Sequence, residues 1–226
     1  NSVFSLSNCI MLKKIFRQND MIYAKILQHI RQGILKKQDY QLLKKRLHLD
    51  FDSEQHFGCI PTKLFPLRAK ADQVNNAMYE KLDGSNFTFE IIKKNDNNTL
   101  ENGKPIPMEL YEKCKRLSQN DVELEFASLT NNIPCQSILH LKIGAIVMCT
   151  INLDMDNGIC NGSQGVITKI VESSNQIIPY VRLSNGIEKP MQPHFWQSEE
   201  YPTISVGQYP LILAWALTIH KIQGAT

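Results

Sequence analysis

Three Asn-Gly pairs stand between short apolar runs in the stretch from residue 139 to residue 192: Asn157-Gly158, Asn161-Gly162 and Asn185-Gly186. Asn-Gly readily adopts the left-handed conformations that tight hairpin turns need, so these pairs predict antiparallel strands joined by short loops. We expect one strand in LHLKIGAIVMCTINL, a second in SQGVITKIVE and two more in IIPYVRLSNGIEKPMQ. Four short strands cannot bury a face as a flat sheet, so this stretch is predicted to curl into a small β-barrel.

The chain on either side of this stretch carries helical and strand patterns in alternation. Apolar residues recur at helical spacing from Ile22 to Ile30, with Asp20 as the expected N-cap and Gly33 just past the end. A second helix is expected from about residue 39, a strand in CIPTKLFPL, and a further helix in KADQVNNAMYEKL. PLILAWAL is a continuous apolar run, typical of a strand buried in a parallel sheet. These patterns predict an α/β layered domain interrupted by the barrel.

The segments that flank the predicted barrel are more polar. Residues 93–107 are rich in Asn and turn-forming residues, which indicates a surface excursion or a domain boundary, and a modest helix is expected near 108–117. No pattern assigns a structure to the rest of residues 93–131. We interpret WQSEEYPTISVGQY as a polar connection back to the layered domain. Phe195 and Trp196 are expected to pack where the barrel rejoins the core, and base stacking is the alternative.

Composition excludes several classes of protein. A chain of 226 residues with 42% hydrophobic residues can bury one core, or one core and a small satellite barrel. Its six cysteines form no C-x-x-C pair, so reduced, packed thiols are expected rather than a zinc site or a disulfide framework. The longest apolar run is too short to cross a bilayer and no leader pattern opens the chain, so we expect an intracellular protein without membrane contact. A first residue other than Met, and an end directly after a polar motif, lead us to expect a fragment.

Two short motifs could carry chemistry. LTIHKIQGAT places polar groups just beyond the end of an apolar strand, where open α/β sheets bind ligands. Its Lys supplies a point charge for phosphate and its Gly permits close backbone approach, although an ordinary polar loop is the alternative. FRQND places Arg17 and Gln18 directly before a helix, which suits bidentate phosphate recognition, with a structural surface arginine as the alternative. The net charge of +3 leans mildly toward anionic partners.

Several catalytic motifs are absent from the sequence. It contains no G-x-x-x-x-G-K-[ST] phosphate loop, because NGSQG has no following Lys and lies between strands. It also contains no nucleophile elbow, H-E-x-x-H pair or G-x-G-x-x-G fingerprint. On residue chemistry alone, this chain cannot hydrolyse a nucleotide unaided, and no metal ligands are predicted.

Four segments, in order, resemble the PIF (petite integration frequency) family of superfamily-one DNA helicases, the branch that also contains RecD. LKKIFRQNDMIYAKILQHIRQGIL is similar to the family's fourth helicase motif, and PTKLFPLRAKADQVNNAMYEKL to the next strand and helix. LKIGAIVMCTINLDMDNGICNGSQGVI is similar to the family's Src-homology-three-like barrel, and YPLILAWALTIHKIQGAT to its fifth motif. PLRAK (66–70) and Ile222 depart from the usual pattern. The resemblance implies a RecA-like, P-loop NTPase-type second motor domain, in residues 1–92 and 205–226, with an insertion in 93–204 that holds the barrel at about 139–192.

The same resemblance implies an ATP-dependent DNA helicase that translocates 5′ to 3′ on single-stranded DNA and unwinds forks, in replication, repair, recombination or telomere maintenance. It implies a monomeric motor whose ATP and Mg²⁺ are held mainly by a first motor domain outside this chain, so the fragment alone is expected to be inactive. The implied catalytic residue is Arg17, and the implied ATP-binding residues are Arg17, Gln18, Lys221, Gln223 and Gly224. The implied DNA-binding residues are Thr62, Lys63, Arg68, Asn75, Thr218 and His220. Two other readings stay open: a non-catalytic module that binds single-stranded nucleic acid, and a structural scaffold that binds none.

Overall fold

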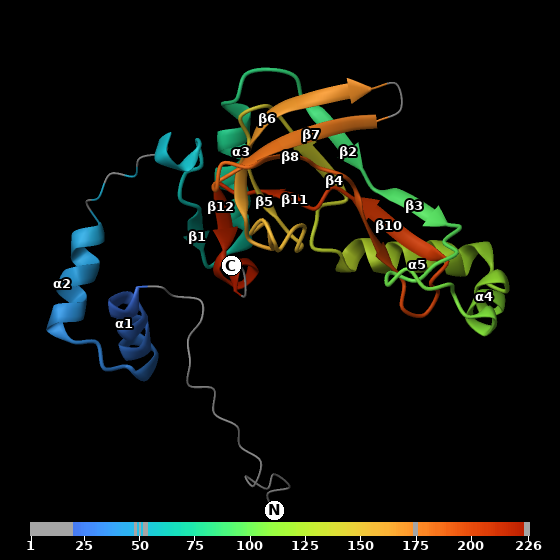
Figure 1. Ribbon diagram of the computed structural model, residues 1–226, viewed down its shortest axis with the longest axis horizontal. Coiled ribbons are helices and arrows are strands. Elements are labelled where there is room, and N and C mark those ends of the chain that lie inside the picture. Colours follow the sequence, from blue (N-terminus) through green and yellow to red (C-terminus); the bar gives the residue numbers. More distant parts are fainter. Residues whose placement is uncertain (1–19, 48, 50, 52–53, 174–175, 224–226) are drawn as a thin grey trace, which may run out of the picture. The chain divides into compact units, whose positions relative to one another are not determined.

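The computed structural model describes residues 20–47, 49, 51, 54–173 and 176–223 of the chain. The chain forms two compact units, residues 1–50 and 51–226. Within the described residues, the first unit contains two helices and the second contains every strand (Figure 1).

The helices of the first unit are α1 (Met21–Gln32) and α2 (Lys37–Arg46). Asp20 caps α1 as predicted, because its carboxylate accepts hydrogen bonds from backbone N–H groups of the first turn. Gly33 ends the helix in the left-handed conformation, at φ 70°. Both helices predicted from the sequence of this unit are therefore confirmed.

The buried face of α1 differs from the predicted one. Ile26 is buried, but Ile22 and Ile30 are 65% and 49% exposed. The buried face instead includes His29, whose Nδ1 lies 2.7 Å from the carboxylate of Asp39 on α2. Two buried polar groups must satisfy each other, so this contact sets the face that α1 turns toward α2.

The second unit is built around a five-stranded antiparallel sheet with the strand order β11-β5-β6-β7-β8. The strands are β5 (Ile146–Cys149), β6 (Gln164–Ser173), β7 (Gln176–Leu183), β8 (Glu188–Pro190) and β11 (Leu211–Leu213). Gly186, at φ 86°, forms the predicted turn between β7 and β8. Val147, Ile167 and Val181 are fully buried in the largest core. No pairing joins β8 to β11 in the described residues, so closure into a barrel stays a prediction.

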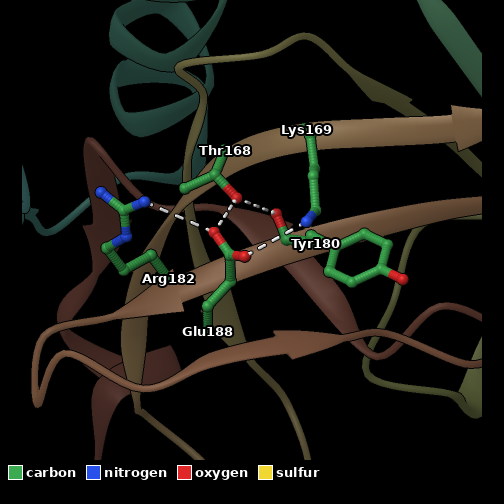
Figure 2. A network of polar contacts seen from close by, with 5 residues as sticks. All are labelled: Thr168, Lys169, Tyr180, Arg182 and Glu188. Carbon is green, nitrogen blue, oxygen red and sulfur yellow. Dashed lines mark hydrogen bonds and ion pairs between the residues drawn. The ribbon is translucent and has the colours of Figure 1, made fainter.

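One face of β6, β7 and β8 carries a polar network (Figure 2). The Glu188 carboxylate accepts a 2.7 Å hydrogen bond from Thr168 Oγ1 and lies 3.4 and 3.5 Å from the cations of Lys169 and Arg182. The Lys169 ammonium also lies 4.3 Å from the ring centroid of Tyr180. The hydrogen bond from Thr168 is the main cause of a lowered Glu188 pKa, followed by the two cations. The network ties together three strands at the point where the register of β6 shifts.

The apolar stretch predicted as a single strand from residue 139 forms two strands. β4 (Ile138–Leu141) pairs with β2 (Phe87–Glu90), while β5 joins the five-stranded sheet. Gly144, at φ 86°, breaks the run between them. A residue with a side chain is strained in that conformation, so the glycine lets one apolar run serve two sheets.

The apolar run PLILAWAL is also divided. Its first part, β11, pairs antiparallel with β5, and its second part, β12 (Ala216–Thr218), pairs in parallel with β1 (Lys63–Phe65). The predicted return to a parallel sheet is therefore correct for β12 and wrong for β11. The helix after β1, α3 (Arg68–Glu80), packs against β12.

A second core lies beneath a three-stranded sheet of order β3-β10-β9. The elements are β3 (Ile92–Asn95), β9 (His194–Gln197), β10 (Ile204–Gln208), α4 (Met108–Lys115) and α5 (Gln119–Asn132). Phe126 of α5 packs on Ile204 and Val206, with Trp196 at the margin. In Figure 1, α4 and α5 lie with this sheet at the end of the second unit away from β1 and β12. The helix expected near 108–117 is confirmed by α4.

The segment interpreted as a polar connection contains the end of β9 and all of β10, and β10 is buried along its whole length. Gly207 of β10 pairs with Phe195 of β9, and a Cβ at Gly207 would lie 2.5 Å from the Phe195 ring. The ring therefore occupies the space that a larger residue would fill. The Lys94 ammonium lies 4.0 Å from the ring centroid. Phe195 is thus engaged in packing, as expected, although in this sheet.

Candidate nucleic-acid interface

The end of β12 turns directly into a short helix, α6 (Ile219–Ile222). Leu217 is buried in the core, whereas Thr218 is half-buried and His220 is exposed. Thr218 starts the helix, since its Oγ1 accepts a 3.3 Å hydrogen bond from the backbone N–H of Lys221. The change from apolar to polar residues thus carries the chain from the core to the surface at the predicted place.

Helix α3 is fixed against this turn by Asn75. The Asn75 side chain donates to the carbonyl of Ala216 at 2.8 Å and accepts from the N–H of Ala216 at 2.9 Å. Both groups are buried, and the pair replaces the hydrogen bonds that a neighbouring strand would make. Asn75 therefore positions α3, and its amide is engaged within the protein.

A cleft of about 1210 Å³ opens between these elements. Its walls come from α3, from the turn between β12 and α6, and from residues 130–137, which form the end of α5 and the segment before β4. The lining includes five residues that were predicted to bind DNA or nucleotide: Arg68, Asn75, Thr218, His220 and Lys221. The structure thus brings together residues that are about 150 positions apart in the sequence.

The basic side chains of the cleft are held in different ways. Lys221 donates from Nζ to the carbonyl of Pro134 at 3.0 Å, and desolvation lowers its pKa. Arg68 is 82% exposed and forms a loose 3.5 Å ion pair with Asp72. The His220 side chain has no hydrogen bond or ion pair within the described residues. Arg68 and His220 are therefore available to an anionic ligand, because a loose surface pair holds little free energy.

The other predicted residues lie elsewhere. The Thr62 hydroxyl donates to the carbonyl of Ala214 at 2.8 Å and accepts from Gln164 at 3.1 Å, which gives it a structural role between β1 and the five-stranded sheet. Lys63 and Gln223 are exposed but do not line the cleft. Arg17, Gln18 and Gly224 lie outside the described residues.

The cleft lining also includes residues that the sequence did not predict, among them the amides Asn76, Asn131 and Gln136. Asn76 directly follows the predicted Asn75, but on a helix neighbouring positions point in different directions. Asn131 lies at the end of α5. The start of this helix could have been found in the sequence, because Ser118 and Asp121 have the spacing of a reciprocal cap. Gln136 lies in a segment without regular structure, and only the folded arrangement shows it.

The described residues contain no cluster of three or more His, Cys, Asp or Glu side chains that could hold a metal ion. Their sequence also contains no G-x-x-x-x-G-K-[ST] phosphate loop. Within the described residues, no helix is long and apolar enough to span a membrane.

Known proteins of one family match this chain. The DNA helicase Pif1, 2B domain family matches residues 125–170, which cover the end of α5, β4, β5 and most of β6. The ATP-dependent DNA helicase PIF1 of Danio rerio is 28% identical over 218 residues, which cover 95% of this chain and 29% of that protein. The chain is similar in sequence to the Pif1 helicases.

Solved Pif1 structures share this fold. A Pif1 helicase from Bacteroides has a TM-score of 0.65 at 24% identity, over 95% of this chain and 43% of that one. The Pif1 helicase from Candida albicans has a TM-score of 0.59 at 24% identity, over 95% of this chain and 48% of that one. This chain therefore has the mixed helix and sheet fold of part of a Pif1 helicase, and spans less than half of each relative.

Proposed function

We propose that this chain is part of an ATP-dependent DNA helicase and that the cleft between α3 and α6 holds single-stranded DNA. The observation that carries the proposal is the placement of Arg68 and His220, without strong partners, in one large cleft. Phosphate groups are the anions that basic side chains without strong partners accept along a polar groove. The names of the relatives, ATP-dependent DNA helicase PIF1, support the same substrate.

In this proposal the cleft residues have separate tasks. Arg68 and His220 contact phosphates, while Thr218 shapes the turn that presents His220. Asn75 acts through the position of α3 rather than through its own contact with DNA. Thr62 and Lys63 are proposed DNA contacts outside the cleft, and only Lys63 has a side chain without a partner in the described residues.

The proposed architecture is a RecA-like second motor domain in residues 1–92 and 205–226, with an insertion in 93–204 that contains an SH3-like barrel at about 139–192. The parallel pairing of β1 with β12 and the packing of α3 on β12 support the first part. The antiparallel sheet formed largely by residues between these strands supports the second.

The nucleotide chemistry belongs to the complete protein. We assign Arg17, with Gln18, to the terminal phosphate of ATP, and Lys221, Gln223 and Gly224 to the nucleotide side of the fifth motif. ATP and Mg²⁺ are assigned mainly to residues outside this chain. We further propose that the complete protein is a monomeric motor that moves from 5′ to 3′ and unwinds forks. Its proposed role is in genome maintenance.

The first test is binding of a fluorescent single-stranded oligonucleotide to the 226-residue chain at several salt concentrations. The Arg68→Gln variant should weaken binding and reduce the dependence on salt by about one released counterion, and the His220→Ala variant should weaken binding. Arg116→Gln changes an exposed arginine next to α4 and is the matched control. Equal binding by all four proteins contradicts the assignment of the cleft.

The second test separates the helicase from a non-catalytic binding module. In the complete protein, Arg17→Ala should abolish ATP turnover while single-stranded DNA binding persists. A complete protein that binds DNA but hydrolyses no ATP, with or without this substitution, is the binding module instead.

A further inference from the structure

Three neutral amides, called the amide wall below, line the same cleft as Arg68, His220 and the carboxylates of Asp72 and Glu80. Asn76 on α3, Asn131 at the end of α5 and Gln136 in the following segment all line the cleft and are exposed. None of these three side chains has a hydrogen-bond partner within the described residues. An amide offers both a donor and an acceptor, so this wall presents unused hydrogen-bonding groups of both kinds.

Aromatic stacking is the usual alternative for holding bases, and the cleft offers little of it. Among the described lining residues, Tyr79 is the sole Phe, Tyr or Trp. Tyr79 is buried, its hydroxyl donates to Asn86, and the Lys142 ammonium lies 4.8 Å from its ring centroid. The ring has no free face for a base, so sequence-tolerant stacking is not built into this site.

We propose that Asn76, Asn131 and Gln136 hydrogen-bond the edges of DNA bases in this cleft, while Arg68 and His220 hold the phosphates. The inference rests on the proposed function, because it takes single-stranded DNA as the occupant. An unpaired strand exposes the donors and acceptors of its Watson–Crick edges, which amides can match. The site therefore reads bases as well as the charge of the backbone.

The experiment compares two oligonucleotides of equal length, one with a mixed base sequence and one with abasic positions throughout. The unmodified chain should bind the base-containing strand at least about tenfold more tightly, as two or three net amide hydrogen bonds would give. The preference for the base-containing strand over the abasic strand should shrink in two variants. These are the double variant Asn76→Ala with Asn131→Ala, and the single variant Gln136→Ala. The dependence on salt should stay unchanged, because the phosphate contacts remain.

A matched control removes two exposed amides from the same two helices. The double variant Gln73→Ala with Asn120→Ala changes side chains that do not line the cleft, and it should keep the full preference. All four substituted positions on α3 and α5 are exposed, so both double variants should unfold at the same temperature as the unmodified chain.

The outcomes separate this inference from the function beneath it. Equal affinity for base-containing and abasic strands overturns the amide wall but leaves single-stranded DNA binding in place. Equal loss of preference in the control double variant also overturns it. A double variant with Arg68→Gln and His220→Ala tests the cleft itself. If the unmodified chain binds neither strand more tightly than this double variant does, the proposed function fails and this inference fails with it.

Discussion

Lys221 of α6 donates a hydrogen bond from its ammonium group to the carbonyl of Pro134 at 3.0 Å, across 87 positions of sequence. Both residues line the cleft, so the contact joins α6 to the segment that links α5 to β4. The fifth-motif lysine, expected on the nucleotide side, thereby holds one wall of the cleft in place. Its lowered pKa reflects desolvation there.

Removal of this contact should loosen that wall. Lys221→Met should lower the free energy of unfolding by about 1 kcal/mol, since one hydrogen bond to a carbonyl is lost. Amide hydrogen exchange should quicken at residues 135–137, measured by mass spectrometry. Lys81→Met, at an exposed lysine without a partner in the described residues, is the control and should leave exchange at 135–137 unchanged. Unaltered exchange in Lys221→Met would show that the contact does not position the wall.

Asn75 and Asn76 offer a direct comparison of a buried and an exposed amide. Asn75→Ala leaves the buried N–H and carbonyl of Ala216 unpaired, and should destabilise the chain by about 2–4 kcal/mol. Asn76→Ala should change stability by less than about 0.5 kcal/mol. In thermal unfolding followed by circular dichroism, the first variant should melt about 5–12 °C lower. Similar melting temperatures for the two variants would contradict the structural role of Asn75.

Gly207 and Phe195 should be energetically coupled. A methyl group in Gly207→Ala would lie 2.5 Å from the Phe195 ring, so the ring must move at a cost of about 1–3 kcal/mol. In a Phe195→Ala background the same glycine substitution should cost much less, because the space is empty. Denaturant unfolding of the four proteins measures the coupling as a double-mutant cycle. Additive effects would mean that the ring does not depend on the glycine.

Glu188 should make stability depend on pH in the acidic range. Its pKa is lowered by the Thr168 hydrogen bond first and then by Lys169 and Arg182, so the folded state favours the carboxylate. The resulting stability is present above the ordinary pKa of 4.5 and is lost as pH falls below it, because the unfolded chain takes up the proton first. Glu188→Gln should therefore reduce the shift in urea midpoint between pH 7 and pH 4. The carboxylate is solvent-accessible, so high salt should weaken the same effect.

Local patterns predicted the elements whose cause is local. The Asn185-Gly186 turn, the N-cap at Asp20 and the strand at Lys63–Phe65 each depend on a few adjacent residues, and each is confirmed. Strand β10 was missed because Ser205 and Gly207 alternate with its apolar residues and make the segment read as polar. Its burial depends on α5 and on Phe195, which the sequence pattern does not place.

In the cleft, too, the sequence predicted the features that have a local cause and missed those that depend on distant residues. A polar turn at the end of a buried strand predicted Thr218 and His220 at a ligand-binding edge, and the structure places both in the cleft. The engagement of Thr62 with Ala214, and of Asn75 with Ala216, spans 152 and 141 positions. Hydrogen bonds over such distances leave no local signal, so only the fold separates side chains that hold the site from those free to bind.

The pairing of β1 with β12 also bears on the order in which the molecule folds. The five-stranded sheet and the second core draw mostly on residues between these two strands, and many of their contacts are hairpins that close quickly. The parallel pair must instead close a loop of about 150 residues, which carries a larger entropy cost. During synthesis the cleft can therefore form only after residues 216–218 have emerged from the ribosome, so nascent chains should acquire the inner sheets before they acquire the binding groove.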